Sequence, residues 1–234
     1  TFDGTAVGDI SVDKAQLTIN LNSFSMEYGT EESQSFKETN YKVDANTTAG
    51  ITNNDVLSEV VVLSDYENTG FDANGRTGNV GGNYLLKAAA NLKGSTLQNS
   101  ASGFSGESAN GNYDVTVNYG DVDIYAKALT AGDILATIGY GSKGGFVIAD
   151  SEKTKLEGIE YGDDVKIDFS AAGKGVTDEY LTSLNSKNGR DTADAGYYDN
   201  DLQLTGLKLE GNAKGNYTFD GTAVGDISVD KAQL

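Results

Sequence analysis

The first 17 residues of the chain, TFDGTAVGDISVDKAQL, recur without a change as residues 218–234. Seventeen consecutive identities do not arise by chance, and self-similarity at a fixed period indicates a repeat architecture. The second copy begins at residue 218 and the first at residue 1, which gives a period of 217 residues. We therefore expect the chain to be a piece of a longer protein, comprising one full period and the opening of the next.

A weaker duplication lies inside this period. The segment GDVDIYAKALT at 120–130 resembles GDISVDKAQLT at 8–18, and in each case a leucine (Leu17 or Leu129) precedes a Tyr-Gly pair by eleven positions. These equal spacings predict two homologous modules per period. The predicted division is a closing strand of a preceding repeat at 1–14, module A at 15–127 and module B at 128–234.

Alternating apolar and polar residues predict β-strands in both modules. The alternation is clear at 18–25, 113–124, 202–209 and 218–229, and Gly-Asn or Asn-Gly dipeptides separate such stretches. We therefore expect a mainly β fold of two tandem β-rich modules arranged end to end. Each module is predicted to be β-sandwich-like, or alternatively β-grasp-like with one short helix.

Two segments leave the secondary structure open. Residues 177–189 begin with a Thr-Asp-Glu cap and end at Asn-Gly, which predicts a short helix. Thr52 and Asp55 could cap a helix that runs through Val61, but the apolar run 60–63 is equally typical of a buried strand.

The junction between modules has no flexible linker. Residues 9–21 contain no Gly and no Pro, whereas a Gly/Ser-rich linker would behave as a random coil. We expect the last strand of one module to run into the first strand of the next and the modules to form a stiff rod.

Charge and composition exclude several classes of function. The chain carries 17 Lys and Arg against 35 Asp and Glu, a formal net charge of −18, and it has no Cys and no His. Such a surface repels phosphate backbones and anionic membranes. Disulfides, thiolate or imidazole metal sites and catalysis by Cys or His are ruled out. We therefore expect no nucleic-acid partner. Because the sequence has no apolar run of transmembrane length, we also expect no membrane insertion by this segment.

Paired carboxylates could in principle serve a glycosidase, which needs two acids on opposite sides of a sugar. The pairs Asp163-Asp164 and Glu31-Glu32 are adjacent in sequence, and neighbours on a strand point to opposite faces. We therefore predict no catalytic residue and no enzymatic activity.

Two acidic loops are candidate calcium sites, because hard cations prefer oxygen ligands. Neither loop has the spacing of an EF-hand, and solvated acidic turns would give the same composition. No cofactor other than calcium is expected. The candidate metal ligands are Asp65, Asp72 and Asn74 in one loop, beside Glu67, and Asp191, Asp194 and Asp199 in the other, beside Asp201.

Several tyrosines lie in motifs that have two interpretations. The Gly-Asn-Tyr sequences at 111–113 and 215–217 could form a ligand loop, or a turn whose Tyr packs at the start of the next strand. The pair Tyr197-Tyr198 could stack on sugars or anchor a protein partner, or could pack across strands. Lys and Asn side chains could also form intramolecular cross-links, which a measurement of intact mass would detect.

These motifs resemble those of a known family. Residues 209–217 read L-x-G-x-A-x-G-N-Y, Tyr-Gly pairs occur at 28–29 and 140–141, and YGDD occurs at 161–164. This combination resembles the YDG and MBG-type tandem repeat domains of large bacterial adhesins of the filamentous-haemagglutinin kind. The match is strongest at the ends of the modules, and module A has one extra residue before its Gly-Asn-Tyr.

The resemblance implies a non-catalytic structural or adhesive repeat of a long extracellular protein on the bacterial cell surface. We expect it to act as a stiff stalk or spacer that extends a distal adhesive region, with adjacent identical repeats as its partners. The alternative is a binding module for a glycan, a host protein or a second copy of itself, as in biofilm formation, with or without calcium. Residues 1–13 are expected to pack against module A or to add to a sheet edge of a neighbouring molecule.

Overall fold

The computed structural model describes residues 8–42, 57–62, 69–92, 95–96, 113–141, 146–170 and 194–233. The chain divides into two compact units. The first comprises Thr1–Met26 and Thr30–Ile124, and the second comprises Glu27–Gly29 and Tyr125–Leu234.

The fold is mainly β, which confirms the predicted class. Among the described residues there is one α-helix, α1 (Gln34–Asn40), which begins where the Ser33 side chain accepts the N–H of Phe36 at 3.1 Å. The segment ending near Val61, which could have been a helix or a strand, contains strand β3 (Leu57–Val62). The predicted helix at 177–189 lies outside the described residues. No helix in the described part of the chain is long and apolar enough to cross a membrane.

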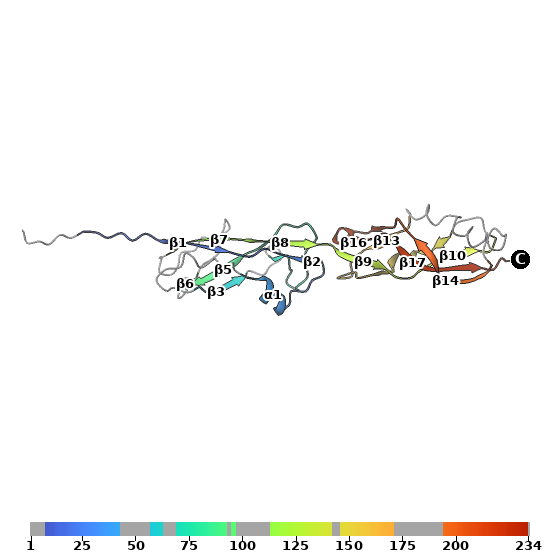
Figure 1. Ribbon diagram of the computed structural model, residues 1–234, viewed down its shortest axis with the longest axis horizontal. Helices are drawn as coiled ribbons and strands as arrows, with labels where there is room; N and C mark the ends of the chain where they lie inside the picture. The colour runs from blue at the N-terminus through green and yellow to red at the C-terminus, as the bar shows by residue number, and fades with distance from the viewer. Residues whose placement is uncertain are drawn as a thin grey trace, which may run out of the picture. The chain divides into compact units, whose positions relative to one another are not determined.

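The first unit contains three small sheets (Figure 1). Their strand orders are β1-β7, β2-β8-β4 and β3-β5-β6, and β1 runs parallel to β7. The strands are β1 (Ala15–Asn20), β2 (Phe24–Glu27), β3 (Leu57–Val62), β4 (Tyr84–Leu86), β5 (Ala88–Leu92), β6 (Ser95–Thr96), β7 (Tyr113–Asn118) and β8 (Gly120–Tyr125).

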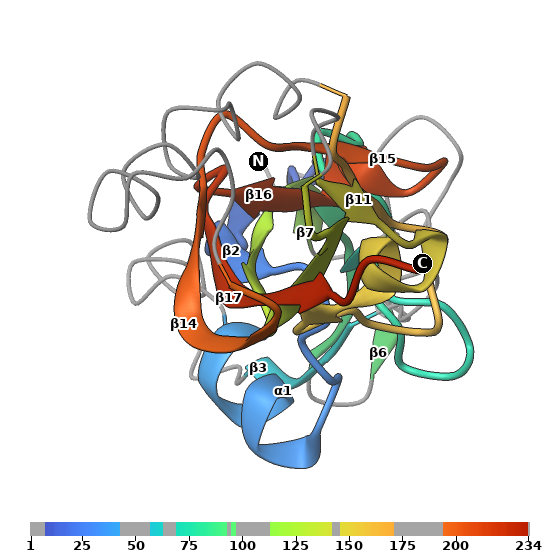
Figure 2. The same cartoon turned by 90° about the vertical axis from the view of Figure 1, so that its right-hand side faces the viewer.

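The second unit also contains three sheets. Their orders are β11-β10-β17-β14, β12-β9-β16 and β13-β15, and the large β14 and β17 lie side by side in Figure 2. The elements are β9 (Lys127–Ala131), β10 (Ile134–Gly139), β11 (Val147–Ile148), the 3-10 helix η2 (Asp150–Thr154), β12 (Leu156–Glu157), β13 (Lys166–Asp168), β14 (Gly196–Leu204), β15 (Lys208–Glu210), the 3-10 helix η4 (Lys214–Asn216), β16 (Tyr217–Phe219) and β17 (Ala223–Asp230).

The core of the second unit lies on one face of its four-stranded sheet. Buried and less buried residues alternate along β10 and β17, as expected for strands that bury one face. The largest core side chains of the sheet come from β10, β14 and β17, and they are Ile134, Ile138, Leu202, Leu204, Ile227 and Val229.

The two units share one pattern of strand pairing. In each, the first strand runs parallel to the last but one, β1 to β7 and β9 to β16. The second strand neighbours the last one, β2 with β8 and β10 with β17. On its other side the last strand pairs antiparallel with a third strand, β8 with β4 and β17 with β14. This likeness supports an internal duplication, while the proposed boundaries of modules A and B stay a prediction.

A glycine near the start of the last strand, the first residue of β8 and the third of β17, lies against a backbone carbonyl in both units. A Cβ on Gly120 would overlap the carbonyl oxygen of Asn22, and a Cβ on Gly225 would overlap that of Ile134. Only a residue without a side chain allows the two backbone segments to approach so closely at these positions. The glycine of the Gly-Asp sequence shared by the two units is therefore required for steric reasons.

Candidate functional site

Three of the sequence motifs meet at one point of the second unit. The hydroxyls of Tyr28 and Tyr217 both donate to Oδ2 of Asp163, each at 2.8 Å. Tyr28 belongs to a Tyr-Gly pair, Asp163 to YGDD and Tyr217 to Gly-Asn-Tyr. We call these three residues the Tyr–Asp cluster.

Turns and strand starts position the three side chains. Tyr28 follows β2, and its N–H donates to the carbonyl of Tyr125 at 2.9 Å. Asp163 follows a turn in which Tyr161 and Gly162 both have positive φ, 55° and 74°. Tyr217 opens β16 directly after η4, opposite Lys127 of β9.

Glu160, a residue of the neighbouring loop, also contacts the cluster. The backbone N–H of Glu160 donates to the hydroxyl oxygen of Tyr217 at 2.9 Å, and the Glu160 side chain forms an ion pair with Lys127. Gly29 has φ of 89°, and a Cβ there would overlap the Glu160 side chain. The Tyr-Gly motif therefore requires its glycine both for backbone conformation and for space.

Aromatic edges close the cluster. The ring of Tyr28 lies edge-on to those of Tyr217 and Tyr161, with centroids 5.4 and 5.6 Å apart. Such edge-to-face contacts are the favourable arrangement of aromatic pairs. Tyr28 and Tyr217 are buried, with 4% and 6% of their surface exposed.

The environment keeps both hydroxyls protonated at neutral pH. Burial, and then the hydrogen bond to Asp163, raise the pKa of Tyr28 well above 10. Burial is also the main cause of the raised pKa of Tyr217, and the bond to Asp163 adds to it. Both tyrosines are therefore fixed donors, and the arrangement suits holding the Glu27–Gly29 segment in the second unit rather than acid–base chemistry.

The acidic residues of the first candidate calcium loop are engaged in a turn. Oδ1 of Asp72 accepts the backbone N–H groups of Asn74 and Arg76 at 2.8 and 3.0 Å. These bonds, with that from Arg76 first, lower the pKa of Asp72. Gly75, with φ of 72°, completes the turn. Asp65 and Glu67 lie outside the described residues.

The second candidate loop is described only in part. Asp191 lies outside the described residues, and the carbonyl of Asp194 accepts the hydroxyl of Tyr198 at 2.7 Å. Asp199 lies exposed on β14 beside Asp226. Within the described ranges, no three or more acidic residues gather as a metal site would require. The calcium assignment stays a prediction.

The two carboxylate pairs have separate partners. Asp163 accepts the two tyrosines, whereas Asp164 pairs with Lys166 at 3.3 Å. Glu32 accepts the hydroxyl of Tyr41 at 2.5 Å and pairs with Lys37 at 3.2 Å. The two carboxylates of Asp163 and Asp164 therefore have different partners.

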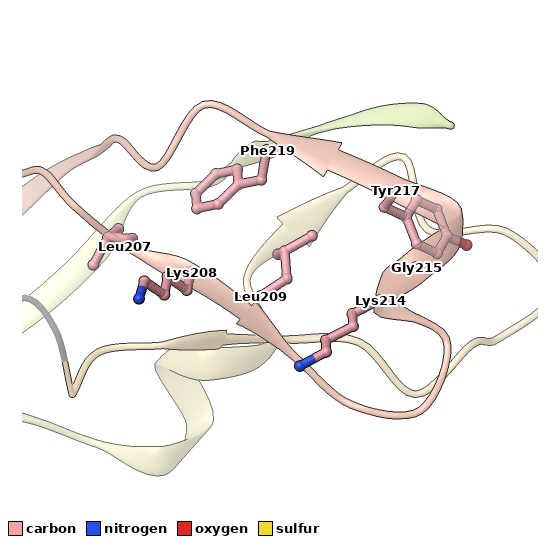
Figure 3. Close-up of a pocket in the computed structure, with 7 residues that line it drawn as sticks. All are labelled: Leu207, Lys208, Leu209, Lys214, Gly215, Tyr217 and Phe219. Atoms are coloured by element: carbon pink, nitrogen blue, oxygen red, sulfur yellow. The ribbon is translucent and has the colours of Figure 1, made fainter. Parts of the chain in front are cut away.

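An open pocket of about 440 Å³ lies beside the Gly-Asn-Tyr turn (Figure 3). Its lining is mainly apolar and includes the rings of Tyr217 and Phe219, while the exposed amines of Lys208 and Lys214 lie at its edge. The sequence did not predict this pocket, because the Gly-Asn-Tyr motif is the only part of its lining that stands out in the sequence. Tyr217 starts a strand, as the turn interpretation of that motif expects.

The exposed tyrosine pair is bonded within its own sheet. Tyr197 is 62% exposed, and its hydroxyl donates to the carboxylate of Asp226 on the neighbouring β17. This hydrogen bond raises the pKa of Tyr197 to about 12. The ring remains accessible to a partner, but the hydroxyl is engaged.

In comparisons with known proteins, no family model, no curated protein and no solved structure matched the chain. The resemblance to adhesin repeat domains therefore stays a prediction.

Proposed function

We propose that the chain is a non-catalytic repeat of a long extracellular bacterial surface protein and acts as a stiff spacer. The observation that carries this proposal is how one period leads into the next. Strand β17 ends at Asp230, and Lys231 is followed by the sequence that forms β1 from Ala15 onward in the first copy. Inside the period, β8 and β9 are likewise separated by Ala126 alone.

This connection favours extension over flexibility. A one-residue interval between the last strand of one unit and the first strand of the next leaves no room for a coiled linker. Repeats joined in this way add length in equal steps and depend mainly on nearest-neighbour contacts. The net charge of −18 would keep neighbouring arrays apart and soluble.

Small-angle X-ray scattering tests the proposal. The present chain is compared with proteins that contain two and three periods, each with calcium and with a chelator. A stiff spacer gives a maximum dimension that grows by the same increment per added period and does not respond to calcium. A maximum dimension that grows roughly as the square root of the number of periods would indicate flexible joints and contradict the proposal.

A glycan-binding module is the second candidate, and the pocket beside β16 is the observation that favours it. Aromatic rings offer flat apolar faces to sugars, and two lysine ammonium groups lie at the pocket edge. This chemistry fits a carboxylated sugar whose ring packs on Phe219 and whose carboxylate meets Lys208 or Lys214.

Isothermal titration with an oligosaccharide of glucuronic acid tests the second candidate. We expect Lys208→Gln combined with Lys214→Gln to abolish the binding seen with the unchanged chain. Lys166→Gln is the matched control, since Lys166 is also an exposed lysine of the second unit but does not line the pocket. Absence of heat with the unchanged chain, or equal loss in the control, would contradict glycan binding there.

A further inference from the structure

One sequence has two environments in this molecule. Residues 225–230 form most of β17, where Ile227 is fully buried and Val229 is 3% exposed. The identical residues 8–13 form no strand, and their Ile10 and Val12 are 91% and 88% exposed. Figure 1 shows this stretch as a plain trace before β1.

The contacts of β17 show what the shared sequence is suited to. Residues 225–230 run parallel to 134–139 of β10, with Ile227 opposite Ala136, and antiparallel to β14 on the other side. Gly225 lies where a Cβ would overlap Ile134.

A polar contact also fixes this strand. The two carboxylate oxygens of Asp226 accept the hydroxyl of Tyr197 and the N–H of Asn200, the latter at 2.8 Å. Asn200 has φ of 55° and lies at the point where the β14–β17 register shifts. The side chain of Asp226 thus satisfies a backbone group that the irregular strand leaves unpaired.

Each of these features is repeated in residues 8–13. Gly8 can approach a carbonyl as Gly225 does, Asp9 can accept the bonds that Asp226 accepts, and Ile10 and Val12 have the apolar surface of Ile227 and Val229. The exposed apolar side chains are the ones that the second unit buries from its own closing strand. A strand that adds to a sheet in this way gains main-chain hydrogen bonds together with side-chain burial.

We propose that residues 8–13 are a donor strand that completes the sheet between β10 and β14 in a second copy of this chain. The donor would take the place and register of β17. In the unchanged chain the resident β17 makes the same contacts and is tethered to its site, so it holds the site at low protein concentration. Exchange becomes visible when β17 is disabled or when chains refold together. In the tandem array of the proposed spacer the same residues would close the sheet of the preceding period, so this proposal concerns separate copies of the 234-residue chain.

The first experiment separates donor from acceptor. The acceptor carries Ile227→Asp and Val229→Asp, which disable β17, and Ile10→Asp and Val12→Asp, which disable its own donor. The unchanged chain is the donor. We expect an equimolar mixture refolded from urea to give a one-to-one heterodimer by light scattering, and a donor carrying Ile10→Asp and Val12→Asp to give none. Equal yields with both donors would overturn the proposal.

The second experiment keeps the core intact, in case the acceptor does not fold. Thr137 lies opposite Ser228, whose counterpart in the first copy is Ser11. Since the chain has no cysteine, Ser11→Cys with Thr137→Cys gives one defined pair. After refolding and oxidation, we expect a disulfide between positions 11 and 137 of different molecules, in a yield that rises with protein concentration.

The matched control combines Ser11→Cys with Lys166→Cys, which lies on another sheet. Mass spectrometry of the digested dimers distinguishes the linkages. Dimers that join position 11 to 137 no more often than to 166 would overturn the proposal, and so would a purely intramolecular bond between 11 and 137.

Discussion

At the scale of single residues, two hydrogen bonds of the Tyr–Asp cluster depend on one carboxylate, that of Asp163. Asp163 accepts two hydroxyls from residues 135 and 54 positions away in sequence. Loss of either tyrosine hydroxyl removes one bond, whereas loss of the carboxylate leaves two buried donors without their acceptor. An unsatisfied buried donor costs more than the bond itself contributes.

We expect Asp163→Ala to lower the free energy of unfolding of the second unit by at least about 2 kcal/mol, because two buried donors lose their partner. Tyr28→Phe should cost less, about 1.5 kcal/mol, the lower end for a bond to a charged group. Tyr125→Phe is the control, since Tyr125 is 53% exposed, and its effect should stay within about 0.5 kcal/mol. Urea denaturation measures all three. Equal effects of Asp163→Ala and Tyr125→Phe would contradict this ranking.

The raised pKa values of Tyr28 and Tyr217 predict an alkaline transition. A tyrosine whose pKa is raised on folding contributes stability that is complete below its unfolded pKa of 10.0 and is lost as the pH rises toward the folded value. We expect the unfolding free energy to fall above about pH 10, and to fall less steeply in a chain carrying Tyr28→Phe and Tyr217→Phe.

Tyrosinate absorbance checks the same prediction directly. In the folded protein, Tyr28→Phe should leave the absorbance at about pH 11 unchanged, because Tyr28 is still protonated there. After unfolding in urea, the same substitution should lower the absorbance by the share of one of the 13 tyrosines. A loss of that size in the folded protein would show that Tyr28 titrates normally.

At the scale of elements, alternation predicted strands well but could not say which strands form. The alternating stretch 218–229 covers most of β16 and most of β17, which are separated by a turn at Gly221 with φ of 78°. Residues 8–13, identical in sequence to 225–230 of β17, form no strand, because a strand is stabilised by neighbouring strands rather than by its own sequence alone. The helix α1 was missed because it is short and polar, and the Ser33 cap was its only signal.

The candidate site shows the same limit. Its three motifs were visible in the sequence, but their meeting was not, since nothing local specifies a contact between Tyr28 and Asp163. The two-way interpretation of Gly-Asn-Tyr likewise depended on burial: Tyr217, the first residue of β16, is buried, which no sequence spacing reveals. The long-range pairing of β9 with β16, which places Tyr217 opposite Lys127, is likewise not specified by any local pattern.

The duplicated sequence offers a matched pair of glycines at this scale. Gly225→Ala should lower the unfolding free energy by at least about 2 kcal/mol, because the new methyl overlaps the carbonyl of Ile134 and the strands must separate. Gly8→Ala makes the same change in the same sequence, but no atom lies within 4 Å of the added Cβ, so we expect a change within about 0.5 kcal/mol. Urea denaturation compares the two variants. Similar costs would mean that local propensity, not the β10–β17 contact, sets the requirement for glycine.

At the scale of the whole molecule, the main electrostatic feature is the excess of negative charge. A surplus of 18 negative charges opposes compaction, because the like charges repel one another. Salt screens this repulsion over a Debye length that falls from about 30 Å at 0.01 M to about 10 Å at 0.1 M. We expect the thermal midpoint to rise over this range of NaCl, measured by circular dichroism. A midpoint that falls would indicate that favourable ion pairs outweigh the net repulsion.

Calcium at matched ionic strength separates general screening from a specific site. The carboxylate of Asp72 is already occupied by two backbone N–H groups, and the described part of the chain gathers no three acidic residues in one place. We therefore expect CaCl2 and NaCl of equal ionic strength to give the same thermal midpoint within about 2 °C, well below the shift that a bound ion at a hundred times its Kd produces. A larger, saturable rise with calcium would contradict this. Its loss with Asp72→Asn would assign the ion to the first acidic loop, and its loss with Asp199→Asn to the second.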